Sequence, residues 1–104
     1  MSSKIKTSGG IVIKENKILF IRKNNRWDLP KGKLEKGINS RETAIIEITE
    51  ETGLKANHDS IIKKLIPTYY HKKVDGVSIV KKTDWYLVEY HGSFDHPLVP
   101  DQSE

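Results

Sequence analysis

The chain contains no cysteine, which excludes disulfide bonds and any metal site built from thiolates. It also lacks a long apolar run: none approaches the ~20 residues of a membrane-spanning helix. The N-terminus, Met1-Ser2-Ser3-Lys4, lacks the apolar core of a signal peptide. We therefore expect a cytoplasmic protein without a membrane partner. A length of 104 residues predicts a single domain over 1–104.

Positive charge is in modest excess, with a formal net charge of +4 and a sequence pI of about 9.3. The lysines are spread along the chain, and the adjacent pairs are Lys63-Lys64, Lys72-Lys73 and Lys81-Lys82. No base-reading motif accompanies them, so a nucleic-acid partner is not expected. We interpret most of them as solvated side chains, while their sign suits an anionic small ligand.

Short apolar runs separated by turn residues predict strands on both sides of one helix. Residues 9–23 are typical of a hairpin turned at Glu15-Asn16, and 61–71 and 77–90 are typical of two more strands turned at 74–76. Five apolar residues of the last strand are expected to be buried: Val77, Ile79, Trp85, Leu87 and Val88. Trp27 is expected in the core or in the wall of a pocket. The pattern predicts an α+β fold with one helix on a mixed sheet.

The helix between these strands has clear boundary residues. Asn39 is a suitable N-cap, with Glu42 three residues later as in a capping box. Gly53 suits the left-handed position just beyond the C-terminus. An apolar stripe of Ala44, Ile45 and Ile48 would lie on the sheet.

Three carboxylates share another face of this helix. The spacing of Glu47, Glu50 and Glu51 places them within about 100° of arc. Hard cations such as Mg²⁺ prefer oxygen ligands, and they bridge and neutralise phosphate oxygens. Helix glutamates by themselves are usually solvated, and Gly32 and Gly37 by themselves are ordinary turn residues. Together, a glycine loop and a three-carboxylate face would suit the cleavage of diphosphates.

The whole segment from Gly32 to Leu54 resembles the signature of the Nudix hydrolases. That signature has a glycine, five residues, a glutamate, seven residues, then arginine-glutamate, an aliphatic, any residue, two glutamates, any residue, glycine and an aliphatic. The Gly9-Gly10 strand and the run 27–30 also fit the family. The resemblance implies an α/β/α sandwich around a mixed sheet. Because the sequence ends at Glu104, we expect the family's C-terminal strand and helix to be missing, which would leave an apolar sheet face and favour a homodimer.

Two signature positions are changed in this chain. The first glutamate falls at Ile38, and the arginine falls at Ile46. In the family the arginine helps to orient the following glutamate, here Glu47, and the first glutamate supports the metal cluster. Loss of such outer partners typically costs ~10–100-fold in affinity or activity. The resemblance therefore implies a weakened hydrolase, and the alternative is a catalytically impaired Nudix-fold module that binds a nucleotide or a protein partner.

Carried over residue by residue, the resemblance implies Glu47, Glu50, Glu51 and the carbonyl oxygen of Gly32 as ligands of Mg²⁺ or Mn²⁺. Glu47 and Glu50 are the expected catalytic residues, with Glu47 the first choice to orient or deprotonate water. Glu89 or Asp95 could serve as a base from a later position, as in some family members.

The resemblance also implies a class of substrate, a nucleoside diphosphate linked to a further group. Lys31 and Lys33 flank Gly32 and could meet phosphate oxygens as point charges. The run 27–33 looks more like the branch that acts on dinucleoside or other polyphosphates than the branch that removes oxidised nucleotides.

Overall fold

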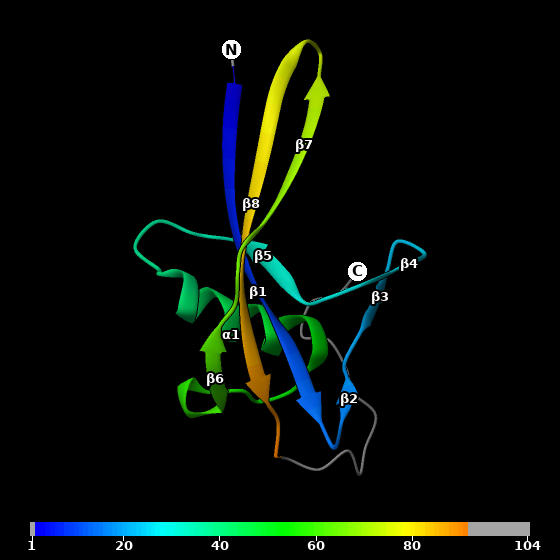
Figure 1. The fold of residues 1–104 in the computed structure, drawn as a ribbon, viewed down its shortest axis with the longest axis vertical. Helices are drawn as coiled ribbons and strands as arrows, with labels where there is room; N and C mark the ends of the chain where they lie inside the picture. The colour runs from blue at the N-terminus through cyan, green and yellow to red at the C-terminus, as the bar shows by residue number, and fades with distance from the viewer. Residues whose placement is uncertain (1, 92–104) are drawn as a thin grey trace.

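The computed structural model describes residues 2–91, and Figure 1 shows their arrangement. The elements in chain order are β1 (Ser2–Lys14), β2 (Lys17–Ile18), β3 (Ile21–Lys23), β4 (Arg26–Asp28), β5 (Lys31–Lys33), α1 (Ser40–Thr52), the 3₁₀ turn η1 (His58–Ser60), β6 (Ile61–Lys64), β7 (Thr68–Val74) and β8 (Val77–Glu89). One helix on a mixed sheet confirms the predicted α+β class. Asp95, and the expected loss of a C-terminal strand and helix, lie outside the described residues.

The sheet is built around a long parallel pair, β1 and β8. Their register runs from Ser2 opposite Ser78 to Ile13 opposite Glu89. The short strands β2 and β5 pair antiparallel with the free edge of β1, while β6 and β7 pair antiparallel with β8. The strands β3 and β4 form a separate hairpin. The sheet is therefore mixed, with its two longest strands at the centre.

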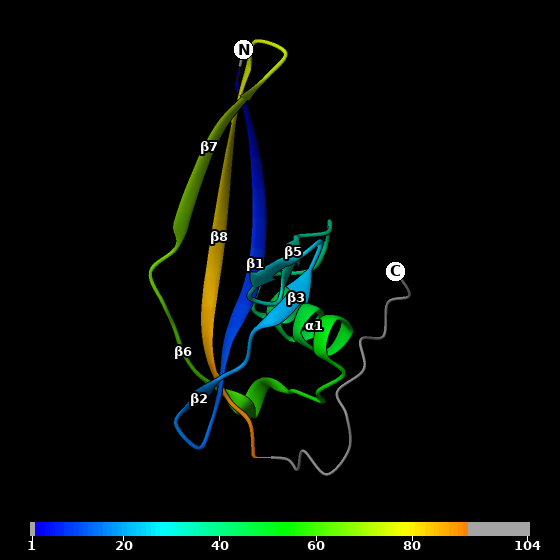
Figure 2. The same ribbon diagram turned by 90° about the vertical axis from the view of Figure 1, so that its right-hand side faces the viewer.

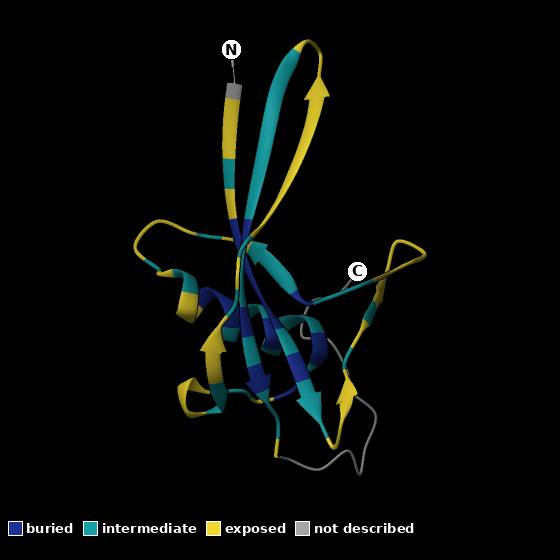
Figure 3. Ribbon diagram, viewed as in Figure 1, coloured by how far each residue is buried: buried dark blue, intermediate teal, exposed yellow. Residues whose placement is uncertain are grey.

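The predicted first hairpin is correct at its turn, where Glu15 and Asn16 have φ angles of 50° and 64°. Its first strand, however, begins at Ser2 and not near residue 9. The early residues are polar, and they are held in the strand because β8 offers them a backbone partner. Together with β7 they form an exposed arm that projects from the body in Figures 1 and 3.

The helix α1 begins and ends where the sequence predicts. The side-chain oxygen of Asn39 accepts the Glu42 N–H at 2.8 Å. Gly53 has a φ of 79° and donates its N–H to the Thr49 carbonyl at 2.9 Å. Ala44 and Ile48 are fully buried, and Ile45 is half-buried. These contacts confirm both caps, and the apolar stripe is confirmed for Ala44 and Ile48 but not for Ile45, which does not pack on the core.

The core lies between α1 and the parallel pair, with α1 on one side of the sheet in Figure 2. Its buried members are Val12, Ala44, Ile48, Leu54, Tyr86 and Val88. Gly10 lies at this contact, where a Cβ would lie 2.4 Å from Cδ1 of Ile48 and the Ile48 side chain would have to shift. Helix and strand therefore approach closely at a residue without a side chain.

Two predictions about aromatic side chains are wrong. On β8 the buried aromatic residue is Tyr86, which is 4% exposed and whose hydroxyl lies 2.5 Å from Oγ of Ser40. Trp85 is only half-buried, as are Val77, Ile79 and Leu87. Trp27 is 68% exposed, with the Arg22 guanidinium 5.2 Å from its ring centre.

Among residues 2–91, no helix is long and apolar enough to cross a membrane.

Candidate functional site

Gly32 and Glu47 meet at the contact between β5 and α1. Gly32 pairs with Ser8 in the antiparallel β5–β1 register. A Cβ at Gly32 would lie 2.2 Å from the Glu47 carboxylate, so this carboxylate packs directly on the backbone of β5. The structure thus brings together the glycine and the first of the three glutamates.

Glu47 lies in an environment that disfavours its charge. Burial raises the pKa of Glu47, the neighbouring charges of Glu50 and Glu51 raise it further, and together they bring it to about 7 despite the nearby Lys23. The charge of Glu35 acts in the same direction. Repulsion among nearby carboxylates is the kind of cost that a bound cation relieves.

Glu51 is held from two directions. Its side chain is only 7% exposed, and Oε2 lies 3.2 Å from Nζ of Lys23. Its other oxygen, Oε1, accepts the backbone N–H of Lys31 at 2.9 Å. Glu50 is half-buried one residue before it. The charges of both Glu50 and Glu51 act on Glu47.

The donor set has the chemistry that a hard divalent cation prefers: carboxylate oxygens, together with the backbone carbonyl that Gly32 could offer. Within residues 2–91, however, no three His, Asp or Glu side chains converge closely enough to hold an ion as they stand. Glu51 already holds two partners, Lys23 and the Lys31 N–H. The glutamates and Gly32 fit such an ion by chemical type.

A polar hollow of about 280 Å³ adjoins the glutamates, and we call it the lysine hollow. It is lined by Thr7, Lys23, Asn24, Asp28, Lys31, Gly32, Lys33, Glu51 and Lys81. Lys31 and Lys33, the two predicted phosphate contacts, both line it. Nζ of Lys31 also lies 2.5 Å from Oδ2 of Asp28. Burial alone would raise the pKa of Asp28, but hydrogen bonds from Lys31 and the Leu29 N–H, with the charges of Lys31 and Lys23, hold this pKa below its usual value.

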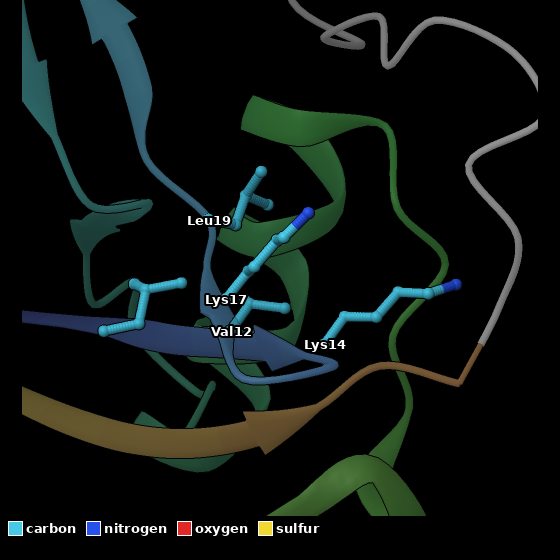
Figure 4. A pocket seen from close by; sticks show the side chains of 5 residues that line it. Val12, Lys14, Lys17 and Leu19 are labelled. Carbon is cyan, nitrogen blue, oxygen red and sulfur yellow. The ribbon is translucent and has the colours of Figure 1, made fainter.

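A second hollow, of about 210 Å³, lies at the β1–β2 hairpin (Figure 4). It is lined by Val12, Lys14, Lys17, Ile18 and Leu19. No carboxylate lines it, so it offers neither a metal ligand nor a base. Four of the predicted site residues, Lys31, Gly32, Lys33 and Glu51, line the lysine hollow instead.

Two sequence positions can now be placed against the site. Glu89 pairs with Ile13 on the parallel ladder, five positions beyond Ser8, which puts it about 16 Å along the strand from Gly32. It also contacts His91 at 2.9 Å. Ile46 is 39% exposed, so the position of the family's arginine holds an apolar side chain that is open to solvent.

Sequence reasoning missed Lys23, Glu35 and Lys81 as residues of this region. Glu35 carried a weak signal, because it lies in the loop three residues after Gly32. Lys81 carried none, since it reaches the site from β8 through pairing between distant parts of the chain. Lys23 carried none either, because it comes from the separate β3–β4 hairpin, whose place beside α1 does not follow from local patterns.

Comparison with known proteins identifies the family of this chain. The NUDIX domain family matches residues 4–104. One relative is the mutator protein MutT4 of Mycobacterium tuberculosis (strain CDC 1551 / Oshkosh), as that protein is named. It is 36% identical to this chain over 66 residues, which cover 64% of this chain and 25% of that protein. The chain thus spans about a quarter of the length of this curated relative.

Two solved structures share the fold. A MutT NUDIX hydrolase from Burkholderia pseudomallei is 19% identical, with a TM-score of 0.72 and coverage of 95% of this chain and 74% of that one. An Ap4A hydrolase from C. elegans is 17% identical, with a TM-score of 0.55 and coverage of 84% and 70%. At these identities the likeness is one of fold.

Proposed function

Since this chain belongs to the Nudix family, we propose that it is a divalent-metal-dependent hydrolase that cleaves a diphosphate linkage in a nucleoside diphosphate derivative. The observation that carries the proposal is the packing of the Glu47 carboxylate on Gly32, with Glu50 and Glu51 beside it. Members of this family generally use divalent metal ions. The expected cofactor is Mg²⁺ or Mn²⁺.

Each group of residues has a role in this proposal. Glu47, Glu50, Glu51 and the carbonyl oxygen of Gly32 would hold the cation, which when bound would neutralise negative charge on the phosphate oxygens. Glu47 would orient the attacking water or accept its proton, because its carboxylate lies at the junction of helix and glycine strand. Lys31 and Lys33 would place the phosphates as point charges.

The finer proposal for the substrate is a dinucleoside polyphosphate. Its support is the run 27–33 in the sequence together with the lysines that surround the hollow. The named activities of the two solved structures belong to those proteins, and a likeness of fold does not choose between them. The positive charges of the lysines around the hollow favour a substrate that carries several negatively charged phosphates.

The test is release of phosphate or nucleotide from nucleoside di- and triphosphates, dinucleoside polyphosphates and nucleotide sugars. Each compound is assayed with Mg²⁺, with Mn²⁺ and with a chelator. Release that requires the metal and is highest for a dinucleoside polyphosphate is the expected result.

A folded protein that releases nothing from any of these compounds would contradict the proposal. It would favour the second candidate, a Nudix-fold module that binds a nucleotide or a protein without cleaving it. Two observations favour this second candidate. The signature has Ile38 and Ile46 in place of its first glutamate and its arginine, and Lys23 pairs with Glu51.

A further inference from the structure

The fold gathers on the exposed arm lysines that are scattered along the sequence. The arm consists of residues 2–7 of β1, all of β7, and β8 as far as Thr83, and it projects from the body in Figures 1 and 3. These segments carry six lysines and a single acidic residue, Asp75. The balance of six positive charges against one exceeds the net charge of +4 of the whole chain. The net positive charge of the chain therefore lies on the arm.

The arm is a regular three-stranded sheet. The strands β7 and β8 pair in antiparallel register along the whole of β7, and β1 runs parallel to β8 on its other edge. The turn at Asp75 and Gly76 has φ angles of 50° and 77°, as a two-residue hairpin turn requires. At the base of the arm, Nε1 of Trp85 donates to Oγ1 of Thr68 at 2.8 Å. Strand alternation therefore gives the side to which each residue of the arm points.

Alternation places four of the six lysines on one face of the arm. Lys6, Lys82 and Tyr69 lie opposite one another in one row across the three strands. In the next row outward, about 7 Å along the strands, Lys4 and His71 lie on either side of Val80. The last row ends with a lysine of β7. The basic face, as we call this surface, consists of Lys4, Lys6, Tyr69, His71, Lys73 and Lys82.

The basic face continues the sheet face that α1 covers in the body. Oγ of Ser8 donates to the carbonyl of Ser40 at 2.6 Å, and Ser40 is the first residue of α1. Lys6 lies two residues before Ser8 and therefore on the same face, but Lys6 and Lys4 are both exposed. Figures 1 and 2 show the arm extending past α1. The same sheet face is thus packed in the body and open to solvent on the arm.

Most of this charge is not neutralised by the chain itself. Lys4, Lys6 and Lys73 form no ion pair with a carboxylate within residues 2–91. Lys82 lies 3.9 Å from Asp84, and Asp84 is shared with Lys64 at 3.6 Å. Three lysines are therefore left to attract an anion from outside the chain.

The aromatic residue of the basic face narrows the choice of anion. Tyr69 is 57% exposed beside Lys82, and proteins that bind single-stranded nucleic acid combine cations for the phosphates with aromatic rings on which bases stack. A duplex keeps its bases stacked inside, out of reach of such a ring. A membrane surface would require large apolar side chains among the lysines, but Ile5, Tyr70 and Ile79 point to the opposite face of the arm.

We propose that the basic face of the arm binds single-stranded nucleic acid, with phosphates at Lys4, Lys6 and Lys73 and a base stacked on Tyr69. These contacts do not read base edges, so they require no base-reading motif in the sequence. The surface is separate from the lysine hollow, because Lys81, the lysine of the arm that lines the hollow, points to the opposite face. The proposal does not depend on the hydrolase activity.

The experiment is fluorescence anisotropy of labelled oligo-U and oligo-dT of about 12 nucleotides, both without a 5′ phosphate, titrated with the protein in chelator at several salt concentrations. One variant combines Lys4→Gln, Lys6→Gln and Lys73→Gln. Its matched control removes the same charge from exposed lysines of the body, by Lys17→Gln, Lys36→Gln and Lys55→Gln. Circular dichroism establishes that each variant is folded.

A second set of variants tests the ring. Tyr69→Ala removes it from the basic face, and Tyr69→Phe keeps it. Tyr70→Ala is the matched control, because Tyr70 is 59% exposed on the same strand and points to the opposite face. Vesicles that contain phosphatidylserine, and polyglutamate, serve as anions without a base.

The expected result is binding of the oligonucleotides that weakens as salt rises. Loss of three phosphate contacts predicts that the arm variant binds at least about tenfold more weakly. The slope of log affinity against log salt should become shallower by about 2. The body variant should change both quantities far less. Tyr69→Ala should weaken binding about tenfold, while Tyr69→Phe and Tyr70→Ala bind as the natural chain does.

Four outcomes would overturn the proposal. They are no binding of either oligonucleotide by the folded protein, equal losses in the arm and body variants, equal losses in Tyr69→Ala and Tyr70→Ala, and tighter binding of vesicles or polyglutamate than of the oligonucleotides. Binding of either oligonucleotide that depends on the arm lysines and on Tyr69 would support it, and the ratio of the two affinities would distinguish RNA from DNA. None of these readouts involves hydrolysis, so the proposed activity is tested separately.

Discussion

At the scale of single residues, Glu47 should make folding depend on pH in the absence of metal. Its pKa in the folded protein is about 7, against 4.5 for the free side chain. The folded state therefore binds more protons than the unfolded state between these values, and stability falls as pH rises from about 4.5 to 7. Because the carboxyl is partly solvated, we expect a loss of about 1 kcal/mol, below the full linkage value.

The measurement is urea unfolding in chelator at several pH values, for the natural chain and Glu47→Gln. The glutamine variant should lose this part of the pH dependence, because it cannot ionise. The matched control Glu42→Gln lies in the first turn of the same helix and is exposed. If Glu47→Gln and Glu42→Gln show the same pH dependence, the environment described for Glu47 is wrong.

Gly32 should be intolerant of even one added carbon. In Gly32→Ala the new Cβ would overlap the Glu47 carboxylate, which it would meet at 2.2 Å, so the glutamate must move. Because the clash is with the flexible end of the Glu47 side chain, the cost in stability should be small, while displacement of Glu47 should lower kcat/KM. Unfolding and turnover are measured on the same preparation.

Gly37→Ala is the control for this change. Gly37 has a φ of 86°, and a Cβ there would meet nothing within 4 Å. Alanine in this left-handed conformation should cost about 1 kcal/mol of stability and leave turnover unchanged. A Gly32→Ala variant with natural turnover would show that Glu47 does not depend on this contact.

At the scale of elements, α1 could be predicted well because its signals are local. The cap at Asn39 and the stop at Gly53 act within a few residues, and the three-carboxylate face follows from helical spacing alone. For β8 the alternation predicts that one of Trp85 and Tyr86 faces inward, without saying which. Parallel pairing of Gly10 with Tyr86 makes that choice, and nothing near Tyr86 in the sequence encodes it.

The N-cap of α1 should contribute measurably to stability. Asn39→Ala removes the 2.8 Å bond to the Glu42 N–H, which predicts a loss of about 1 kcal/mol. Asn57 is the control, because it precedes η1 without a side-chain bond to the backbone there, and Asn57→Ala should cost less. Thermal or urea unfolding gives both values, and equal losses would contradict the role assigned to Asn39.

At the scale of the whole molecule, the sheet joins the two ends of the described chain, and sequence patterns could not predict this. Ser2 pairs with Ser78 and Thr7 with Thr83, so the hollow is completed by strands that are far apart in sequence. The predicted part of the site, Gly32 with the three glutamates and Lys31 with Lys33, lies within one continuous segment. Lys81 enters only through this long-range pairing, and Lys23 enters from the separate β3–β4 hairpin.

The homodimer is predicted from an apolar sheet face, and the face in question is the one opposite α1. Ile11 and Leu87 pair on β1 and β8, one residue from the helix-facing Gly10 and Tyr86, so alternation turns them to the other face. Both are half-buried. The homodimer stays a prediction.

The most direct test of the proposed hydrolase activity is the rate of metal-dependent hydrolysis in Glu50→Gln. The assay uses the compound that the natural chain cleaves best, with Mg²⁺ or Mn²⁺ at saturation and Glu42→Gln alongside. Removal of one ligand charge predicts that Glu50→Gln loses about 100-fold or more in rate, while Glu42→Gln keeps the natural rate. A Glu50→Gln protein that hydrolyses as fast as the natural chain would contradict the account of the three glutamates.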